Sequence, residues 1–441
     1  MSHDSYPTAD LRSFVEVSAE SHFPIQNLPL RGFSFPTAGG APRVGVAIGE
    51  MVCDLSVLDE AGLLDSTPVA GQGIFAQDAL NAFMARGRPA WSAVRRRLQH
   101  LLREDVAELR DDQAVRDRAL LPLGAVELRL PARIGDYTDF YSSREHATNV
   151  GTMFRGKDNA LLENWLHLPV AYHGRASSVV ISGTPIRRPR GQMMPPGAQR
   201  PVFGPTRLLD HEFEMGFFVG PGNAMGEPIP IERAGDHIFG LVLVNDWSAR
   251  DIQKWEYQPL GPFLAKNFAT SISPWVVTLE ALEPFRCAGP EPEFEPLPYL
   301  RSPEPWSYDV RLETLLATER MDRPQVIGRG NYRTLYWNIC QQLAHHTVGG
   351  CPVQPGDLMA SGTISGATRE SRGSLLELTW RGTEPLRLES GEERKFLEDG
   401  DTMTLTGWAQ GDGFRVGFGE VTGRILPAID SAADPRQGDS P

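Results

Sequence analysis

The stretch Leu209–Gly220 reads LDHEFEMGFFVG, and it decides how the rest of the chain is interpreted. Its residues alternate, so that Glu212 and Glu214 fall on one face of an extended strand and Phe213 and Met215 fall on the other. A half-buried strand with a solvated outer face is one explanation. The apolar flanks favour a central strand instead, where two adjacent carboxylates repel each other unless a cation or a shared proton offsets them. The stretch alone leaves both interpretations open.

Two aspartates stand at the polar ends of similar segments. Asp246 follows the continuous apolar run Ile238–Asn245, which is typical of a strand buried on both faces. Asp139 lies in a stretch that is dense in polar and aromatic residues. Carboxylate oxygens suit hard cations such as Ca2+ or Mg2+ better than they suit zinc. The candidate ligands of such a cation are Asp139, Glu212, Glu214 and Asp246.

A histidine and a further glutamate are candidates for acid–base chemistry. His146 could be a general base beside the cation, because imidazole titrates near physiological pH; a hydrogen-bonded structural histidine is the alternative. Glu377 lies in Ser374–Trp380, which we expect to be a strand, and a buried carboxylate there needs a partner such as a catalytic histidine. An outward-facing glutamate is the alternative. Three further candidates are Arg155, Gln253 and Lys266. Each could be a solvated surface residue, or the three together could stabilise an oxyanion.

Composition narrows the class of protein. The 441 residues are 41% hydrophobic and 22% charged, which is globular composition, and 44 glycines and 36 prolines favour turns and short strands. A net charge of −13 argues against a nucleic-acid partner. No apolar run is long enough to span a membrane, and no secretory signal begins the chain. The four cysteines lack metal-type spacing and are interpreted as reduced thiols of a cytoplasmic protein.

The chain divides after Pro131, where its composition changes. We expect a small β-rich domain over residues 1–131 and a larger domain over 132–441, with a polar tail from about residue 427. Within the first domain, Arg43–Leu55 predicts a hairpin that turns at Gly49 and Glu50. Helices are expected over Ala76–Arg86, from Pro89 to about Arg103, and over Tyr332–His345. No phosphate loop or dinucleotide fingerprint is present.

Several long strings in the chain resemble the fumarylacetoacetate hydrolase family. They include FPIQNLP at 23–29, IGDYTDFYSSREHATNVG at 134–151, FRGKDNALLENWLHLPVAYHGRASS at 154–178, LLDHEFEMGFFVGPGN at 208–223, LVNDWSARDIQKWEY at 243–257, GPFLAKNFATSISPWVV at 261–277 and GDLMASGTISG at 356–366. The likeness runs from about residue 14 to about residue 428. These motifs are far longer and more specific than a short pattern.

The resemblance implies a mainly β protein that forms a homodimer. Its N-terminal domain would be a small SH3-like β-barrel, and its C-terminal domain would be all-β with the family's own fold. The implied reaction is metal-dependent hydrolysis of the carbon–carbon bond of 4-fumarylacetoacetate to fumarate and acetoacetate, the last step of tyrosine and phenylalanine catabolism. The implied cofactors are Ca2+ and Mg2+.

The resemblance also implies roles for individual residues. His146, oriented by Glu377, would be the general base that deprotonates water, and the metal would hold the departing acetoacetate as an enolate. The implied oxyanion donors are Arg155, Gln253 and Lys266. Near the cation the family places Asp139, Glu212, Glu214, Asp246, Lys266 and Thr270. The implied substrate contacts are Tyr141, Arg155, Tyr172, Gln253, Tyr257 and Thr363.

Two other functions compete with this one. A related acylpyruvate hydrolase, decarboxylase or hydratase would share the acidic metal site. A calcium-binding β-module used only for interaction would need the carboxylates. It would not explain why His146, Lys266 and Arg155 accompany them. Loss of absorbance of a β-diketone, with and without a chelator, discriminates among these functions.

Overall fold

The computed structural model describes residues 9–35 and 41–429. Its N-terminal part is built on a five-stranded antiparallel sheet of order β4-β3-β2-β1-β5. The predicted hairpin is confirmed, because β2 and β3 pair with Ile48 opposite Met51, and Gly49 adopts a positive φ of 54° at the turn. The strands are β1 (Leu30–Ser34), β2 (Arg43–Ile48), β3 (Met51–Asp54), β4 (Leu120–Pro122) and β5 (Glu127–Arg129).

This sheet is a half-barrel. Its outer strands β4 and β5 each pair with one neighbour, and they do not pair with each other in the described part of the chain. The SH3-like barrel therefore stays a prediction. Residues 1–8 of the predicted first domain and 430–441 of the predicted tail lie outside the described residues.

Five helices pack with the sheet. The helix expected from Pro89 is confirmed as α3, and its apolar stripe, which includes Trp91 and Leu98, is buried. The helix expected over Ala76–Arg86 is shorter, because only the four residues of α2 are helical. The helices are α1 (Leu55–Glu60), α2 (Asn81–Met84), α3 (Arg88–Leu102), α4 (Ala107–Arg110) and α5 (Gln113–Ala119).

The C-terminal part contains a large mixed sheet in the order β7-β6-β22-β13-β14-β16-β8, with the short β17 also paired to β14. Its centre is the antiparallel pair β13–β14, in which every residue is buried. The strands are β6 (Tyr137–Phe140), β7 (Ala171–His173), β8 (Val179–Ile181), β13 (Phe213–Val219), β14 (Ile238–Asp246), β16 (Thr270–Ile272), β17 (Val277–Thr278) and β22 (Leu358–Ala360).

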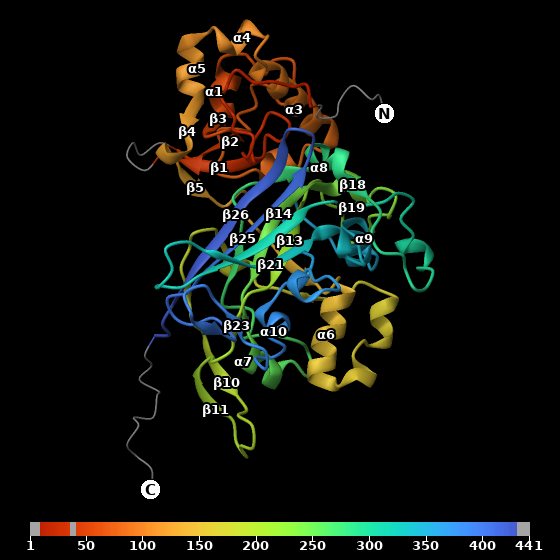
Figure 1. The fold of residues 1–441 in the computed structure, drawn as a ribbon. Coiled ribbons are helices and arrows are strands. Elements are labelled where there is room, and N and C mark those ends of the chain that lie inside the picture. The colour runs from red at the N-terminus through yellow and green to blue at the C-terminus, as the bar shows by residue number, and fades with distance from the viewer. Residues whose placement is uncertain (1–8, 36–40, 430–441) are drawn as a thin grey trace.

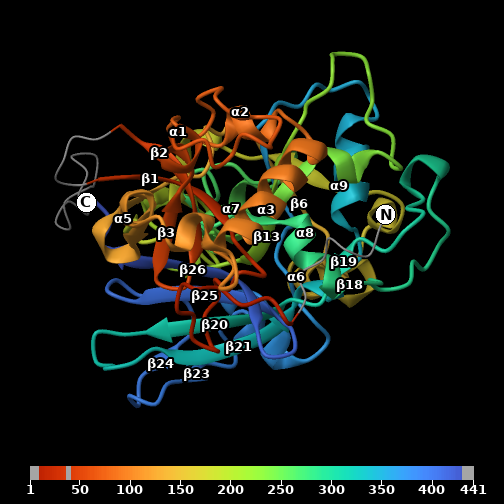
Figure 2. The ribbon, with the colours of Figure 1, turned by 90° about the horizontal axis from the view of Figure 1, so that it is seen from above.

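A second sheet, of order β21-β20-β25-β26-β9, packs against β14 (Figures 1 and 2). Leucine and phenylalanine side chains from both sheets, including Leu243, Leu405 and Phe418, form the core between them. The mainly β architecture is thus confirmed. The strands of this sheet are β9 (Ile186–Arg187), β20 (Arg311–Ala317), β21 (Gln325–Asn331), β25 (Thr402–Gln410) and β26 (Arg415–Leu426).

The described residues of the C-terminal part also form four short strand pairs and five helices. The strands of each pair have two or four residues. The pairs are β10 (Arg190–Met193) with β11 (Val202–Pro205), β12 (Leu209–Asp210) with β15 (Ser248–Ala249), β18 (Arg286–Cys287) with β19 (Ser307–Tyr308), and β23 (Leu386–Arg387) with β24 (Glu393–Arg394). The helices are α6 (Arg144–Arg155), α7 (Arg250–Glu256), α8 (Leu279–Leu282), α9 (Ile339–Thr347) and α10 (Leu375–Leu378).

Two predictions for this part need correction. The helix expected over Tyr332–His345 begins only at Ile339, where Asn338 and Gln341 form a capping box. The segment Ser374–Trp380 is not a strand. The Ser374 side chain accepts a hydrogen bond from the backbone N–H of Glu377 and so starts the short helix α10, which the apolar run LLEL did not reveal.

The two parts share one hydrophobic core. Side chains from the first sheet, such as Val44 and Val46, lie in the same buried cluster as Phe239 and Val242 of β14. The backbones of Leu30 and Val276 exchange two hydrogen bonds, of 2.9 and 3.0 Å, across the junction. The described residues contain no helix that is long and apolar enough to cross a membrane.

Candidate active site

The acidic stretch Leu209–Gly220 is more deeply buried than its alternation suggests. Glu212 is 5% exposed, and Glu214, in β13, is fully buried. The half-buried strand with a solvated face is therefore wrong for this segment, because its acidic face is covered by the walls of a site. Glu212 lies between β12 and β13 and forms an isolated bridge with Ser374.

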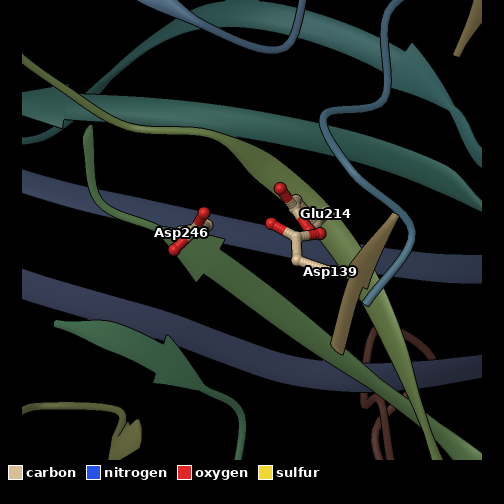
Figure 3. A group of neighbouring side chains, drawn as sticks. All are labelled: Asp139, Glu214 and Asp246. Carbon is tan, nitrogen blue, oxygen red and sulfur yellow. The ribbon is translucent and has the colours of Figure 1, made fainter. Parts of the chain in front are cut away.

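Three carboxylates converge at the end of the central strands. Asp139 of β6, Glu214 of β13 and Asp246 at the end of β14 each offer an oxygen, and these oxygens lie within 4.8 Å of one another. Figure 3 shows the three side chains pointing toward a common point. We refer to these residues as the acidic cluster. The sheet order brings β6, β22, β13 and β14 side by side, which is why residues far apart in sequence meet here.

The described residues offset the charge of the acidic cluster only in part, through Lys266 at Asp246. Burial, followed by repulsion from neighbouring carboxylates, raises the pKa values of Asp139 and Glu214 well above their ordinary range. Asp139 Oδ1 and Glu214 Oε1 have no hydrogen-bond partner within the described residues. The Tyr172 hydroxyl lies 3.0 Å from Asp139 Oδ2 and 2.9 Å from Asp246 Oδ2, but it has only one proton to donate. Buried carboxylate oxygens without donors fit a hard cation.

Glu212, by contrast, is paired with basic side chains. Lys266 Nζ donates to Glu212 Oε2 and, at 2.8 Å, to Asp246 Oδ2. Arg250 Nη1 lies 2.6 Å from Glu212 Oε1. Burial alone would raise the pKa of Glu212, but the charges of Lys266 and Arg250 outweigh burial and lower it. We refer to Glu212, Lys266 and Arg250 as the paired group. Of the four predicted ligands, three lie in the acidic cluster and Glu212 lies beside it.

His146 and Glu377 form a buried dyad. His146 lies in the first turn of α6, and its Nδ1 is 2.7 Å from Glu377 Oε2. If Nδ1 carries the proton, Nε2 is free to accept one; Nε2 lies 4.0 Å from Glu212 Oε1. Burial opposes ionisation of Glu377, yet the interaction with His146 and hydrogen bonds from Asn149 and Ser365 lower its pKa to about 2.

A cavity of about 450 Å³ joins these groups. Its lining combines polar side chains with apolar ones that include Val150, Phe154 and Leu161. Such a combination is typical of a small-molecule site. The predicted residues on its walls are Asp139, Tyr141, His146, Arg155, Tyr172, Glu212, Gln253, Tyr257, Lys266 and Thr363. The remaining predicted residues, Glu214, Asp246, Thr270 and Glu377, lie behind the lining.

The supporting contacts explain why these residues are held in place. Thr270 Oγ1 donates to Asp246 Oδ1 at 2.9 Å. Arg155 donates to the carbonyl oxygens of Asn159 and Ala160, at 3.0 and 2.7 Å, which fix its guanidinium on the cavity wall. Thr363, which also lines the cavity, has a buried Oγ1 without a hydrogen-bond partner within the described chain.

Sequence reasoning missed Arg250. This residue begins α7, four positions after Asp246, and lines the cavity. Its Nη1 donates to Gln253 Oε1 at 3.1 Å, and its Nη2 has no hydrogen-bond partner in the part of the chain that the structure describes. An arginine so close after an acidic strand end was the available signal. Also missed were the donors to Glu377, which are Asn149, Ser365 and Ser374.

A histidine–carboxylate dyad, cationic donors and an acidic cluster that could hold a metal ion lie around one cavity on a mixed β-sheet, which is the arrangement of an enzyme active site. Two family models match the chain: Fumarylacetoacetase N-terminal over residues 26–131, and Fumarylacetoacetate (FAA) hydrolase C-terminal over residues 136–426.

Curated relatives agree with both matches. The fumarylacetoacetases of Bos taurus and Homo sapiens are 56% identical to this chain over 422 and 420 residues, which cover 95% of the chain and 100% and 99% of those proteins. The fumarylacetoacetase of Arabidopsis thaliana is 54% identical over 418 residues, which cover 95% of the chain and 99% of that protein. The chain therefore belongs to the fumarylacetoacetase family.

Proposed function

We propose that this chain hydrolyses the carbon–carbon bond of 4-fumarylacetoacetate to give fumarate and acetoacetate, as the last step of tyrosine and phenylalanine catabolism. The observation that carries the proposal is identity of 50–56% over 95% of the chain to fumarylacetoacetases of animals, plants and Dictyostelium discoideum. A dyad and cationic donors beside an acidic cluster suit such a hydrolysis. A related β-diketone or acylpyruvate hydrolase or decarboxylase is the second candidate, because it would use the same acidic cluster.

The base in this proposal is His146. Its Nε2 accepts a proton from water, and the resulting hydroxide attacks the ketone carbon next to the fumaryl group. Glu377, at 2.7 Å from Nδ1, stabilises the imidazolium that forms. Cleavage of the carbon–carbon bond leaves its electron pair on acetoacetate, and the proton held by His146 then returns to that carbon.

The oxyanion of the tetrahedral intermediate needs hydrogen-bond donors. Lys266, Gln253 and Arg155, the last residue of α6, all line the cavity. Arg250 joins this set because its Nη2 is a buried donor without a partner among the described residues. Its contact with Gln253 Oε1 leaves the Gln253 amide N–H groups free to donate. The substrate contacts we propose are Tyr141, Arg155, Tyr172, Gln253, Tyr257 and Thr363.

The acidic cluster would hold Ca2+ or Mg2+, with Glu212 as a fourth carboxylate ligand and Lys266 and Thr270 beside it. The support is the unpartnered oxygens of Asp139 and Glu214. A cation there supplies positive charge that offsets the negative charge developing on the departing acetoacetate.

The assay is loss of absorbance of 4-fumarylacetoacetate in the presence and absence of a chelator. We expect hydrolysis that stops when the cation is removed and returns when Ca2+ or Mg2+ is added. Acylpyruvates are tested in parallel. Faster turnover of an acylpyruvate than of 4-fumarylacetoacetate would favour the second candidate, and activity that resists the chelator would reject the cation.

We also propose that the protein is a cytoplasmic homodimer with domains at 1–131 and 132–441, a tail from about 427 and an SH3-like N-terminal barrel. Four free cysteines suit a reducing compartment. Exposed apolar side chains of the catalytic part, such as Phe263 and Trp255, suit a subunit interface. Light scattering at micromolar concentration checks the dimer, and a monomer mass would reject it.

A further inference from the structure

A buried aspartate outside the cavity lining connects the two chemical parts of the site. Asp210 ends β12, two residues before Glu212, and is fully buried. Its carboxylate accepts hydrogen bonds from four N–H groups. These are the backbone N–H groups of His211 (2.8 Å), Leu375 (2.7 Å) and Leu376 (3.0 Å), and Nε of Arg250 (2.8 Å).

One of these contacts fixes Arg250. With Nε held by Asp210 and Nη1 held by Glu212 and Gln253, the planar guanidinium has one orientation. That orientation leaves Nη2 as its single unpartnered nitrogen within the described chain. Asp210 also supplies the negative charge that, with Glu212, keeps this buried arginine charged, because burial alone would lower its pKa.

Two other contacts fix the dyad. The N–H groups of Leu375 and Leu376 belong to the first turn of α10, where no preceding residue of the helix can accept them. Glu377 is the next residue, and its carboxylate reaches His146 from this turn. A shift of α10 would therefore change the distance between Glu377 and the base.

We propose that Asp210 is a positioning residue that sets the geometry of Arg250 and of the His146–Glu377 dyad through one carboxylate. This inference rests on the proposed hydrolysis. Asp210 touches neither the cavity nor the reacting atoms, so it acts only through the residues that it holds. Misplacement of catalytic groups by about 1 Å from a remote substitution costs about 10²-fold in rate.

The chain offers a matched control in its N-terminal part. Asp54 is also fully buried, accepts from the backbone N–H groups of Ser56 and Val57 at the start of α1, and binds Arg43 Nη1 at 2.9 Å. It therefore makes the same kinds of contact without any link to the cavity. Loss of either carboxylate removes a helix cap and an arginine partner, but only Asp210 lies beside the dyad.

The experiment compares Asp210→Asn with Asp54→Asn in the full-length, cation-loaded protein. Melting temperature, kcat and KM for 4-fumarylacetoacetate are measured for both. We expect both variants to melt at a lower temperature. We expect kcat to fall about 10²-fold in Asp210→Asn with KM changed little, because the lost interactions act in the transition state, and kcat to stay near that of the wild type in Asp54→Asn. Equal kcat in the two variants, with an active wild type, overturns the proposal.

A triple variant, compared with its double-variant background, tests whether Asp210 acts through its contacts. We expect Asp210→Asn to add little loss of kcat in an Arg250→Met, Glu377→Gln background, because both routes are then already removed. A full 10²-fold further loss would mean that Asp210 does not act through them.

If Asp210→Asn does not fold, Asp210→Ser replaces it, since a hydroxyl still accepts from α10. If neither Asp210 variant folds while Asp54→Asn does, the proposal is overturned and Asp210 is required for folding instead. An inactive wild type rejects the hydrolysis itself.

Discussion

Glu212 and Glu214 are two residues apart and almost equally buried, yet their surroundings drive their pKa values in opposite directions. Glu214 belongs to the acidic cluster, where burial and Asp139 raise its pKa. Glu212 belongs to the paired group, where Lys266 and Arg250 outweigh burial and lower its pKa. Burial therefore does not decide the charge state of a carboxylate in this site, and the charge of its neighbours does.

The same difference separates two roles within the site. The paired group and Asp210 carry two positive and two negative charges, and so they need no further ion. The acidic cluster holds three carboxyl groups and, among the described residues, one positive partner, Lys266 at Asp246 Oδ2, so that without a cation Asp139 and Glu214 hold protons above their ordinary pKa range. The proposed cation would offset the charge of the acidic cluster, and Glu212 would link that cluster to the paired group.

The largest effect is expected where the groups meet. Asp246 belongs to the acidic cluster and also binds Lys266, so Asp246→Ala removes a proposed cation ligand and a lysine partner. We expect loss of stoichiometric Ca2+ or Mg2+ and of measurable turnover in a folded protein. Elemental analysis and the absorbance assay check this. Asp399→Ala, which removes an exposed partner of Arg188, is the control. Retained stoichiometric cation in Asp246→Ala would count against the cluster.

The dyad is tested next. We expect His146→Ala to lose turnover while cation and substrate binding remain, and Glu377→Gln to lower kcat by about 10²- to 10⁴-fold, which is the usual size of a general-base contribution. The double variant should be hardly worse than the worse single variant, because the two residues act as a unit. Multiplicative losses would mean independent residues. Near-normal turnover of His146→Ala would reject this mechanism and favour a decarboxylase or hydratase.

Isosteric amides compare the two glutamates directly in cation-free protein at pH 8. Glu212→Gln leaves Lys266 and Arg250 with one carboxylate fewer, and we expect the free energy of unfolding to fall by about 3 kcal/mol. Glu214→Gln relieves repulsion in the acidic cluster, and we expect a rise of about 1 kcal/mol. Urea unfolding of both variants measures the change. Changes of the same sign would remove the distinction between the groups.

The smallest effect is a pH dependence. The raised pKa values of Asp139 and Glu214 mean that the folded, cation-free protein holds protons that the unfolded chain releases. Their contribution to stability is complete below about pH 4 and is lost as pH rises through the raised values. A cation replaces those protons, so the gap in melting temperature between Ca2+-loaded and chelator-treated protein should widen by a few degrees from pH 5.5 to pH 8. A gap independent of pH would contradict this.

The sequence predicted much of the catalytic part, and the reasons for success and failure are physical. The apolar flanks of the 209–220 stretch and the continuous apolar run before Asp246 indicated central strands, because strands buried on both faces are apolar along their whole length. The resemblance supplied residues from six segments, of which ten line one cavity. The pairing of Glu212 with Lys266 and Arg250 was not visible, because it depends on a fold that joins positions 38 to 54 residues apart. Glu377 was misassigned to a strand, since a four-residue helix with a serine cap has no periodicity to read.

The hydrophobic core that joins the two parts of the chain has a consequence for how the protein unfolds. Two segments that family models recognise separately share buried side chains and a backbone pairing between Leu30 and Val276. Neither segment can leave the other without exposing that core to water. Calorimetry should therefore record a single endotherm for the whole chain. A fragment that begins at residue 132 should aggregate on expression. Co-expression of the missing N-terminal segment as a separate chain should keep that fragment soluble.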